Sequence, residues 1–287
     1  MHFHIVDVFA EDKYQGNQLA VFQSDVDISQ EEMQQIAKEM NFSETTFIMS
    51  GRRGNGGYDV KIFTPDAEIP FAGHPSLGTA YVIRRFIEDH YTDQVLLNLN
   101  VGQVPVVFEG ERGWMTQNEP AFHDVLDAAR LADTLHISQA DIEAGYPVQP
   151  VSTGLPSIIV PLATRDAVDR CRVEHRLYDE ILDEIGDANL LVFAPEPVHA
   201  DNDLYVRVFM FTSGHLEDPA TGSANGNLAA WLLQHSYFKN TSLNYKVEQG
   251  LPVGRPSLLH VAAEKESSFS IQVGGHVFVT AEGTWNL

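Results

Sequence analysis

The chain has 287 residues, of which 44% are hydrophobic and 10% aromatic, so it can bury one large core or two smaller ones and is neither disordered nor a small disulfide-stapled scaffold. Lys and Arg total 18 against 40 Asp and Glu, and the net charge of −22 argues against nucleic-acid partners and against anionic membrane surfaces. The single cysteine, Cys171, excludes an intrachain disulfide and any chemistry that needs two thiols from one chain. The N-terminus lacks a signal-peptide pattern and no apolar run reaches membrane-spanning length, so we expect a soluble protein of the reducing cytoplasm.

Short segments rich in β-branched and aromatic residues, bounded by Gly, Asn or Pro, predict strands along most of the chain. These segments are residues 2–10, 18–23, 45–50, 58–64, 95–99, 104–109, 157–162, 189–194, 204–211, 258–264, 269–273 and 277–281. Helical spacing predicts helices over 29–40, with Ser29 as the cap and Glu32 in the capping-box position, and over 127–135 and 175–185.

Two further predicted helices, 75–89 and 224–234, are apolar on all sides. The first is expected to bury Leu77, Ala80, Val82, Ile83, Phe86 and Ile87. A helix that is apolar all round is a buried helix. Many short strands together with buried helices indicate sheets that wrap around them.

An internal repeat precedes both buried helices. Residues 60–63 (VKIF) match residues 206–209 (VRVF), and residues 68–74 (EIPFAGH) match residues 217–223 (EDPATGS). Each copy runs from a strand through an acidic-x-Pro turn and a glycine into a buried helix, half a chain apart. The repeat predicts two similar halves, 1–117 and 118–275, joined near residues 117–123.

The starts of the two buried helices, Gly73-His74 and Gly222-Ser223, are candidate anion sites. Helix N-termini present unpaired N–H groups and a partial positive charge, and glycine allows a ligand to approach the backbone closely. Two such termini at one cleft would hold a carboxylate despite the net charge of −22. The alternative is that these residues are ordinary helix caps, for which Ser223 is well suited.

Three single residues are candidates for acid–base chemistry. Glu44 lies where a turn meets a strand, Asp218 precedes a proline in a turn, and His74 has an imidazole that titrates near neutral pH. Each also has an ordinary interpretation: a solvated loop carboxylate, a turn-forming aspartate and a structural histidine. No phosphate loop, nucleophile elbow or HExxH spacing is present, and His2 and His4 fit strand alternation better than metal binding, so no metal and no cofactor is predicted.

Four motifs together resemble the PhzF-like (phenazine biosynthesis) family over nearly the whole chain. They are residues 16–21 (GNQLAV), 43–47 (SETTF), 72–80 (AGHPSLGTA) and 217–224 (EDPATGSA). The resemblance implies the diaminopimelate-epimerase-like α+β fold, in which two pseudo-symmetric halves each curl a mostly antiparallel sheet around a central buried helix, with the site between them. It also implies that a closing strand at about 276–287 returns to the first half, and that the protein is a homodimer.

The resemblance implies a cofactor-independent isomerase that moves a proton within a small cyclic or unsaturated amino or carboxylic acid, as trans-2,3-dihydro-3-hydroxyanthranilate isomerase does. Glu44 would be the general base and acid, while His74, Asp218 and Ser223 would line the pocket, orient the substrate and help to move protons. The implied substrate contacts are Asn17, Gly73, Gly222 and Ser223.

Related epimerases and racemases use one cysteine before each central helix, and here those positions hold Ala72 and Thr221. Two-thiol racemisation is therefore excluded, and acid–base work is left to carboxylate and imidazole. Two other functions fit the same residues: a catalytically silent binding or scaffolding protein, and a cofactor-independent lyase.

Overall fold

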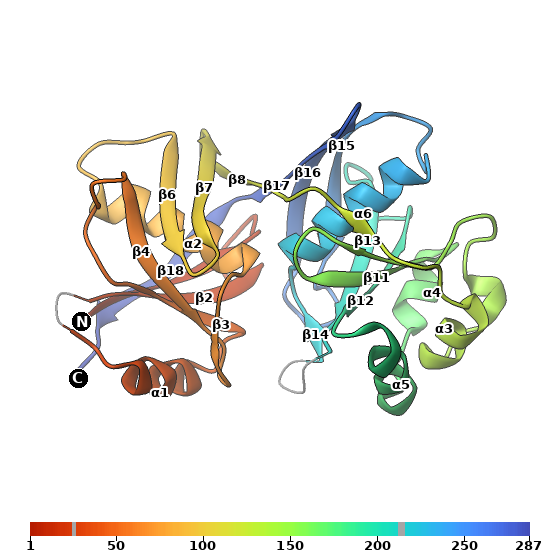
Figure 1. The fold of residues 1–287 in the computed structure, drawn as a ribbon, viewed down its shortest axis with the longest axis horizontal. Coiled ribbons are helices and arrows are strands. Elements are labelled where there is room, and N and C mark those ends of the chain that lie inside the picture. The colour runs from red at the N-terminus through yellow and green to blue at the C-terminus, as the bar shows by residue number, and fades with distance from the viewer. Residues whose placement is uncertain (25–26, 212–215) are drawn as a thin grey trace. The chain divides into compact units, whose positions relative to one another are not determined.

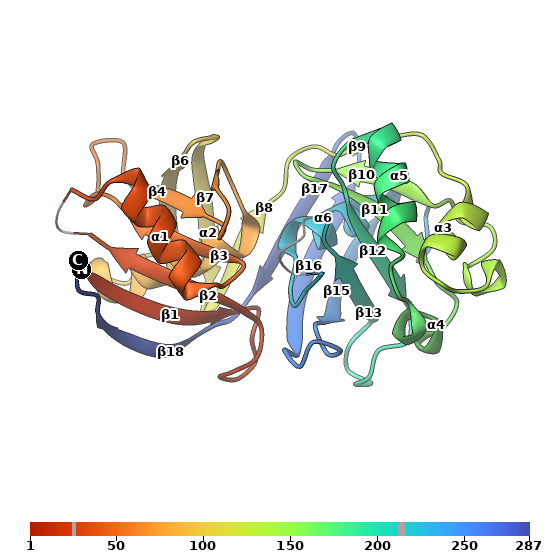
Figure 2. The ribbon, with the colours of Figure 1, turned by 90° about the horizontal axis from the view of Figure 1, so that it is seen from below.

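The computed structural model describes residues 1–24, 27–211 and 216–287, and the chain divides into two compact units (Figures 1 and 2). Unit 1 comprises Met1–Thr116 and Gly274–Leu287, and unit 2 comprises Gln117–Val273. Within the described residues, no helix combines the length and the apolar character needed to span a membrane.

Unit 1 is a curled sheet with the strand order β18-β1-β2-β3-β4-β6-β7-β8. Its strands are β1 (His2–Val8), β2 (Asn17–Gln23), β3 (Glu44–Ile48), β4 (Gly57–Phe63), β5 (Glu68–Ile69), β6 (Gln94–Leu99), β7 (Gly102–Glu109), β8 (Arg112–Thr116) and β18 (Val277–Thr284). The pairs β2–β3 and β4–β6 are parallel, and the short strand β5 pairs antiparallel with β4. The remaining neighbours along this order are antiparallel.

The central helix of unit 1 is α2 (Gly73–Val82), which contacts β1, β2, β3, β6, β7 and β8 (Figure 1). Gly78 allows this close packing, because a Cβ there would lie 2.7 Å from the side chain of Leu19 and 2.8 Å from that of Val8. Helix α1 (Gln30–Met40) begins at its predicted cap Ser29 and packs against β3 and β4.

Two details of the predicted helix 75–89 are wrong. The helix begins two residues earlier, at Gly73, and after Val82 it continues as a π-helical turn, η1 (Ile83–Ile87). The wider π turn changes the direction in which the last side chains point. Phe86, predicted to be buried, is therefore 44% exposed.

Unit 2 has the strand order β9-β10-β11-β12-β13-β15-β16. Its strands are β9 (Ala121–Phe122), β10 (Gln149–Ser152), β11 (Pro156–Pro161), β12 (Asn189–Ala194), β13 (Leu204–Phe209), β14 (Glu217–Asp218), β15 (Ser242–Gln249), β16 (Ser257–Lys265) and most of β17 (Phe269–Gly275). Its helices are α3 (Ala128–Thr134), the 3-10 turn η2 (Gln139–Asp141), α4 (Arg165–Arg170), α5 (His175–Ile185) and the central α6 (Gly222–Gln234). Helix α6 contacts β10, β11, β15 and β16, while α3, α4 and α5 pack around a separate cluster of buried side chains.

The two units repeat one pairing pattern. In unit 1 the succession β1-β2-β3-β4-β6-β7 reads antiparallel, parallel, antiparallel, parallel, antiparallel. In unit 2 the succession β10-β11-β12-β13-β15-β16 reads the same. The matched segments form β4 and β13, and both buried helices begin at the repeated glycine, Gly73 or Gly222. The predicted fold class is confirmed: each unit is a curled, mostly antiparallel sheet around one buried helix.

Candidate active site

Three elements of unit 1 begin at one edge of its sheet. Strand β2 begins at Asn17, strand β3 at Glu44, and helix α2 carries His74 as its second residue. Strands β2 and β3 are parallel, with Leu19 opposite Glu44. Because parallel strands start at the same edge, the side chains of Asn17 and Glu44 lie near the start of α2.

The side chains of Asn17, His74 and Glu44 form a short row. The His74 Nε2 atom is 3.3 Å from Glu44 Oε2, and the Asn17 Nδ2 atom is 3.3 Å from His74 Nδ1. The imidazole is 6% exposed and the Glu44 side chain 15%. Asn17 is fully buried, so the carboxylate is the member of this row that solvent or a small ligand reaches most easily.

Burial controls the protonation of His74. Removal of the ring from water lowers the pKa of His74 to about 3, although a hydrogen bond with the backbone of Gln18 acts in the opposite direction. The ring is therefore neutral near pH 7. The Asn17 amide donates to Nδ1 only in the tautomer that carries the ring proton on Nε2, and that tautomer also points an N–H at Glu44.

The contact between His74 and Glu44 is close without being a hydrogen bond. The Nε2 atom of His74 is buried and meets no hydrogen-bond geometry, even though Oε2 lies 3.3 Å away. Oε2 of the carboxylate is therefore placed beside the ring without a hydrogen bond to it. A positioned carboxylate is a group that can exchange a proton with a ligand.

A hydroxyl pair, absent from the residues singled out in the sequence, fixes this geometry. The Thr46 and Thr79 Oγ1 atoms are 2.7 Å apart and join β3 to α2 in the core. Thr46 lies two residues after Glu44, and Thr79 lies five residues after His74. The hydroxyl pair therefore holds the carboxylate and the imidazole in register. Both threonines lie inside the recognised motifs, which is the only signal the sequence offers for them.

In unit 2, different hydrogen bonds hold the residues at the start of α6. The N-cap is Thr221, whose backbone is extended and whose hydroxyl donates 2.5 Å to Asp218 Oδ2 instead of capping the helix. Asp218 is buried, at 6% exposed. Ser223 is the second residue of the helix, so its interpretation as an ordinary cap is wrong. Gly222 and Ser223 stand where helix amides lack intrahelical partners.

A buried amide holds the turn before α6. The Gln249 Nε2 atom on β15 donates 2.8 Å to the Asp218 carbonyl, and Gln249 Oε1 accepts from the Thr221 amide at 3.2 Å. The same oxygen accepts from Asn225 Nδ2 at 2.9 Å. Sequence reasoning missed Gln249, because it comes 31 residues after Asp218 and carries no motif. Its bonds fix the turn that carries Asp218.

The two units differ at the position of Glu44. In unit 1 the first residue of β3, Glu44, stands opposite Leu19 of β2, and in unit 2 the first residue of β12, Asn189, stands opposite Ser157 of β11. Asn189 is fully buried. Equivalent positions of the repeat therefore hold one carboxylate and one amide, and only the carboxylate can exchange a proton near neutral pH.

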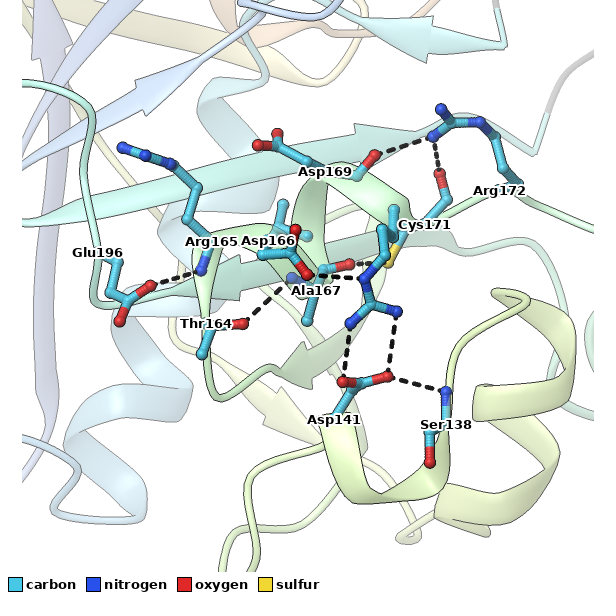
Figure 3. Close-up of polar contacts among 12 residues, drawn as sticks. Ser138, Asp141, Thr164, Arg165, Asp166, Ala167, Asp169, Cys171, Arg172 and Glu196 are labelled. Carbon is cyan, nitrogen blue, oxygen red and sulfur yellow. Dashed lines mark hydrogen bonds and ion pairs between the residues drawn. The ribbon is translucent and has the colours of Figure 1, made fainter.

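The thiol of Cys171 lies in the core beside α4, as Figure 3 shows. It donates 3.3 Å to the Ala167 carbonyl, its residue is fully buried, and burial raises its pKa to about 12. A buried neutral thiol is a poor nucleophile. Around it, Thr164 caps α4 and Asp141 pairs with Arg170, so this region of unit 2 is a structural network (Figure 3).

A cavity of about 620 Å³ lies in unit 2, and none of the predicted site residues lines it, although Glu217 directly precedes Asp218. Three arginines line it together with Asp169, Tyr205 and Glu217; they are Arg165, Arg172 and Arg207. Arg207 is already neutralised by a bidentate pair with Glu217, at 2.7 and 3.0 Å. Lys61 and Glu68, the matching residues of unit 1, form a looser pair at 3.7 Å. The Arg207 pair is thus part of the repeated fold.

Comparison with known proteins adds a family and a fold. A family model described as phenazine biosynthesis-like protein matches residues 6–283. Trans-2,3-dihydro-3-hydroxyanthranilate isomerase of Pseudomonas fluorescens is 33% identical over 99% of this chain and 99% of its own. A phenazine biosynthesis protein of the PhzF family from Bacillus anthracis has a TM-score of 0.91 at 24% identity, covering 100% of this chain and 99% of that one. A predicted epimerase from Pseudomonas aeruginosa has a TM-score of 0.81 at 29% identity, covering 99% and 98%.

Proposed function

Because the chain belongs to the phenazine biosynthesis-like protein family and is an isomerase of the PhzF type, we propose that it moves a proton within a small cyclic or unsaturated amino or carboxylic acid without a cofactor. The relative named above suggests trans-2,3-dihydro-3-hydroxyanthranilate as the model substrate. The observation that carries the proposal is the contact of 3.3 Å between Glu44 and His74 at the edge of unit 1.

In the proposed reaction, the Glu44 carboxylate takes a proton from a carbon of the substrate. The electron pair of the broken C–H bond spreads into the adjacent unsaturated system. The double bond shifts, and the Glu44 carboxyl returns the proton to a second carbon of the same molecule. One C–H bond breaks and one forms, so no oxidant, reductant or cofactor is consumed.

The other residues of unit 1 have supporting roles in this proposal. His74 is neutral, because burial lowers its pKa to about 3, and it is proposed to position Glu44 through their 3.3 Å contact. Asn17 fixes the ring of His74 by its contact at Nδ1 and is proposed to reach the substrate. The backbone of Gly73 is proposed to donate to a substrate carboxylate, as helix N-termini do with anions.

In unit 2 we propose the start of α6 as a second source of donors. The backbone amides of Gly222 and Ser223 would bind the substrate carboxylate, with the helix dipole contributing about 0.3–1 kcal/mol or more when partly buried. Asp218 and the Ser223 hydroxyl would bind polar groups of the substrate and assist proton movement. Gln249 supports this role because it fixes the turn on which Asp218 lies.

The test is Glu44→Gln, which keeps the size and hydrogen-bonding capacity of the side chain and removes the base. We expect turnover to fall by about 10² to 10⁴, the usual contribution of a positioned proton-transfer group. Glu39→Gln, an exposed carboxylate on α1, is the matched control and should be neutral. The proposal for Glu44 is wrong if the folded variant keeps activity within a few-fold of the parent chain.

The assay in deuterated water separates the alternatives. Trans-2,3-dihydro-3-hydroxyanthranilate and other cyclic or unsaturated amino acids are incubated with the full chain in deuterated water. The masses and the deuterium content of the products are measured by mass spectrometry. An isomerase yields one product of unchanged skeleton with deuterium on carbon. A lyase yields two fragments, and a silent scaffold leaves every compound unchanged. Homodimer formation and a cytoplasmic location stay predictions.

A further inference from the structure

Two histidines and a glutamate meet on adjacent strands of unit 1, apart from the row around Glu44. His2 and His4 lie on β1, which runs beside β18 (Figure 2). The two strands pair antiparallel, and His4 stands directly opposite Glu282. Side chains two residues apart on a strand point to the same face. The side chains of β1 alternate between the two faces of the sheet, so the imidazoles of His2 and His4 lie on the same face, beside the carboxylate of Glu282.

The ligand atoms of these three side chains lie close to one another. One ligand atom from each of His2, His4 and Glu282 lies within 4.8 Å of the others. The His4 Nε2 to Glu282 Oε2 distance is 3.8 Å, beyond hydrogen-bond range, and the two imidazole rings are 4.9 Å apart at their centroids. In the described part of the chain, this is the one group of three or more such side chains at metal-binding separations.

Packing orients the ring of His4. His4 is 2% exposed, and Phe86, on the π turn after α2, stacks on it with centroids 4.3 Å apart. The His4 Nδ1 atom is buried and makes no hydrogen bond, so the ring is held by packing and not by a polar partner.

We propose that His2, His4 and Glu282 bind one divalent transition-metal ion of the Zn²⁺ type, with water completing the coordination. Two imidazole nitrogens and a carboxylate oxygen form a ligand set that Zn²⁺ accepts at about 2.0–2.2 Å. Ligand atoms around such an ion are roughly 3.3 Å apart, so the separations, which are at most 4.8 Å, must contract by up to about 1.5 Å. His2 and Glu282 are exposed and can rotate, whereas His4 is the fixed point.

The ion would fasten the closing strand to the first strand of unit 1. Glu282 lies on β18 and His2 begins β1, so coordination would add a side-chain link to the β1–β18 ladder. The site needs neither Glu44 nor His74. Its predicted effect is on stability, since a ligand that binds only the folded state raises the free energy of unfolding.

The experiment uses the full chain without a polyhistidine tag, stripped with a chelator, and titrates Zn²⁺ by calorimetry and Co²⁺ by visible absorption. The parent chain should bind one Zn²⁺, show the intense bands of low-symmetry Co²⁺, and melt at a higher temperature with Zn²⁺ present. His2→Ala and Glu282→Gln each remove an exposed ligand and spare the core. Each should weaken Zn²⁺ binding at least about tenfold, since loss of an outer-shell partner alone costs 10–100-fold.

His136→Asn is the matched control. His136 is an exposed histidine 3.5 Å from Glu174 in unit 2, and asparagine tolerates its left-handed backbone, at φ 52°. This variant should bind Zn²⁺ as the parent chain does. The proposal is overturned if the parent chain binds no Zn²⁺, or if His2→Ala and Glu282→Gln bind it with parental affinity.

Discussion

The burial of His74 should make the stability of the protein depend on pH in a way that one substitution reveals. Folding lowers the pKa of His74 from about 6.5 to about 3, so between these values the unfolded chain holds a proton that the folded chain excludes. The stabilisation from the neutral ring is complete above about pH 6.5 and is lost as the pH falls toward 3. At pH 5 the cost is about 2 kcal/mol, from 1.36 kcal/mol per pH unit over about 1.5 units.

The perturbation is His74→Gln, which removes the titrating ring and keeps an amide that can donate toward Glu44. Urea unfolding of both chains at pH 7.5, 6.5, 5.5 and 5.0 gives the difference in free energy of unfolding at each pH. The parent chain should lose about 2 kcal/mol relative to the variant between pH 7.5 and pH 5, because groups that both chains share cancel. In a parallel NMR titration, the His74 ring resonances should not move above pH 5.

A difference that stays constant from pH 7.5 to 5.0 would refute the reasoning, because it would mean that His74 has the same proton affinity in both states. Ring resonances that titrate near pH 6.5 would refute it independently. Restricting the range to pH 5 and above keeps most carboxylate titration out of the comparison.

Three further outcomes are expected. Alkylating reagents should leave the folded chain unmodified at Cys171 and its activity intact; rapid labelling with loss of activity that substrate prevents would contradict the thiol-free reaction. Gly78→Ala should lower the free energy of unfolding by about 1–3 kcal/mol, because the new methyl would lie 2.7 Å from Leu19, and an unchanged denaturation midpoint would show that α2 can move away. Gly222→Val should raise KM more than it lowers kcat, by blocking the backbone donor; an unchanged KM would remove the start of α6 from the proposed binding site.

Local signals predicted the elements that local interactions stabilise. The helix 175–185 has the predicted bounds, and α1 begins at Ser29 because the cap bonds within its own first turn, with the Glu32 amide donating to Ser29 Oγ at 3.1 Å. Short strands that depend on pairing with other strands were not predicted. Strand β10 has four residues including a proline, and β8 contains a glycine beside its tryptophan. Their ladders with β11 and β7 decide their structure.

The candidate site shows the same division. The repeat led to both helix starts, Gly73-His74 and Gly222-Ser223, from residue order alone. Nothing in the spacing of Glu44 and His74 brings them together, because their contact depends on the parallel register of β2 with β3 and on the position of α2. Only the family resemblance joined these two residues in advance. Neither the repeat nor the family resemblance predicted Gln249, because its bonds to the turn at Asp218 depend on the position of β15.

The asymmetry between the units bears on the kind of reaction. A racemase that works with two bases needs a proton acceptor on each side of its substrate, and the positions that the resemblance implies for two thiols hold Ala72 and Thr221. The repeat could have supplied two carboxylates, but the position of Glu44 is occupied by Asn189 in unit 2. His74 cannot replace a second base that must become charged, because a pKa of about 3 makes its protonation near pH 7 cost roughly 5 kcal/mol. If Glu44 both removes the proton and returns it, as proposed above, with Asp218 in an assisting role, the chemistry favours transfer between two carbons of one molecule over inversion at one carbon.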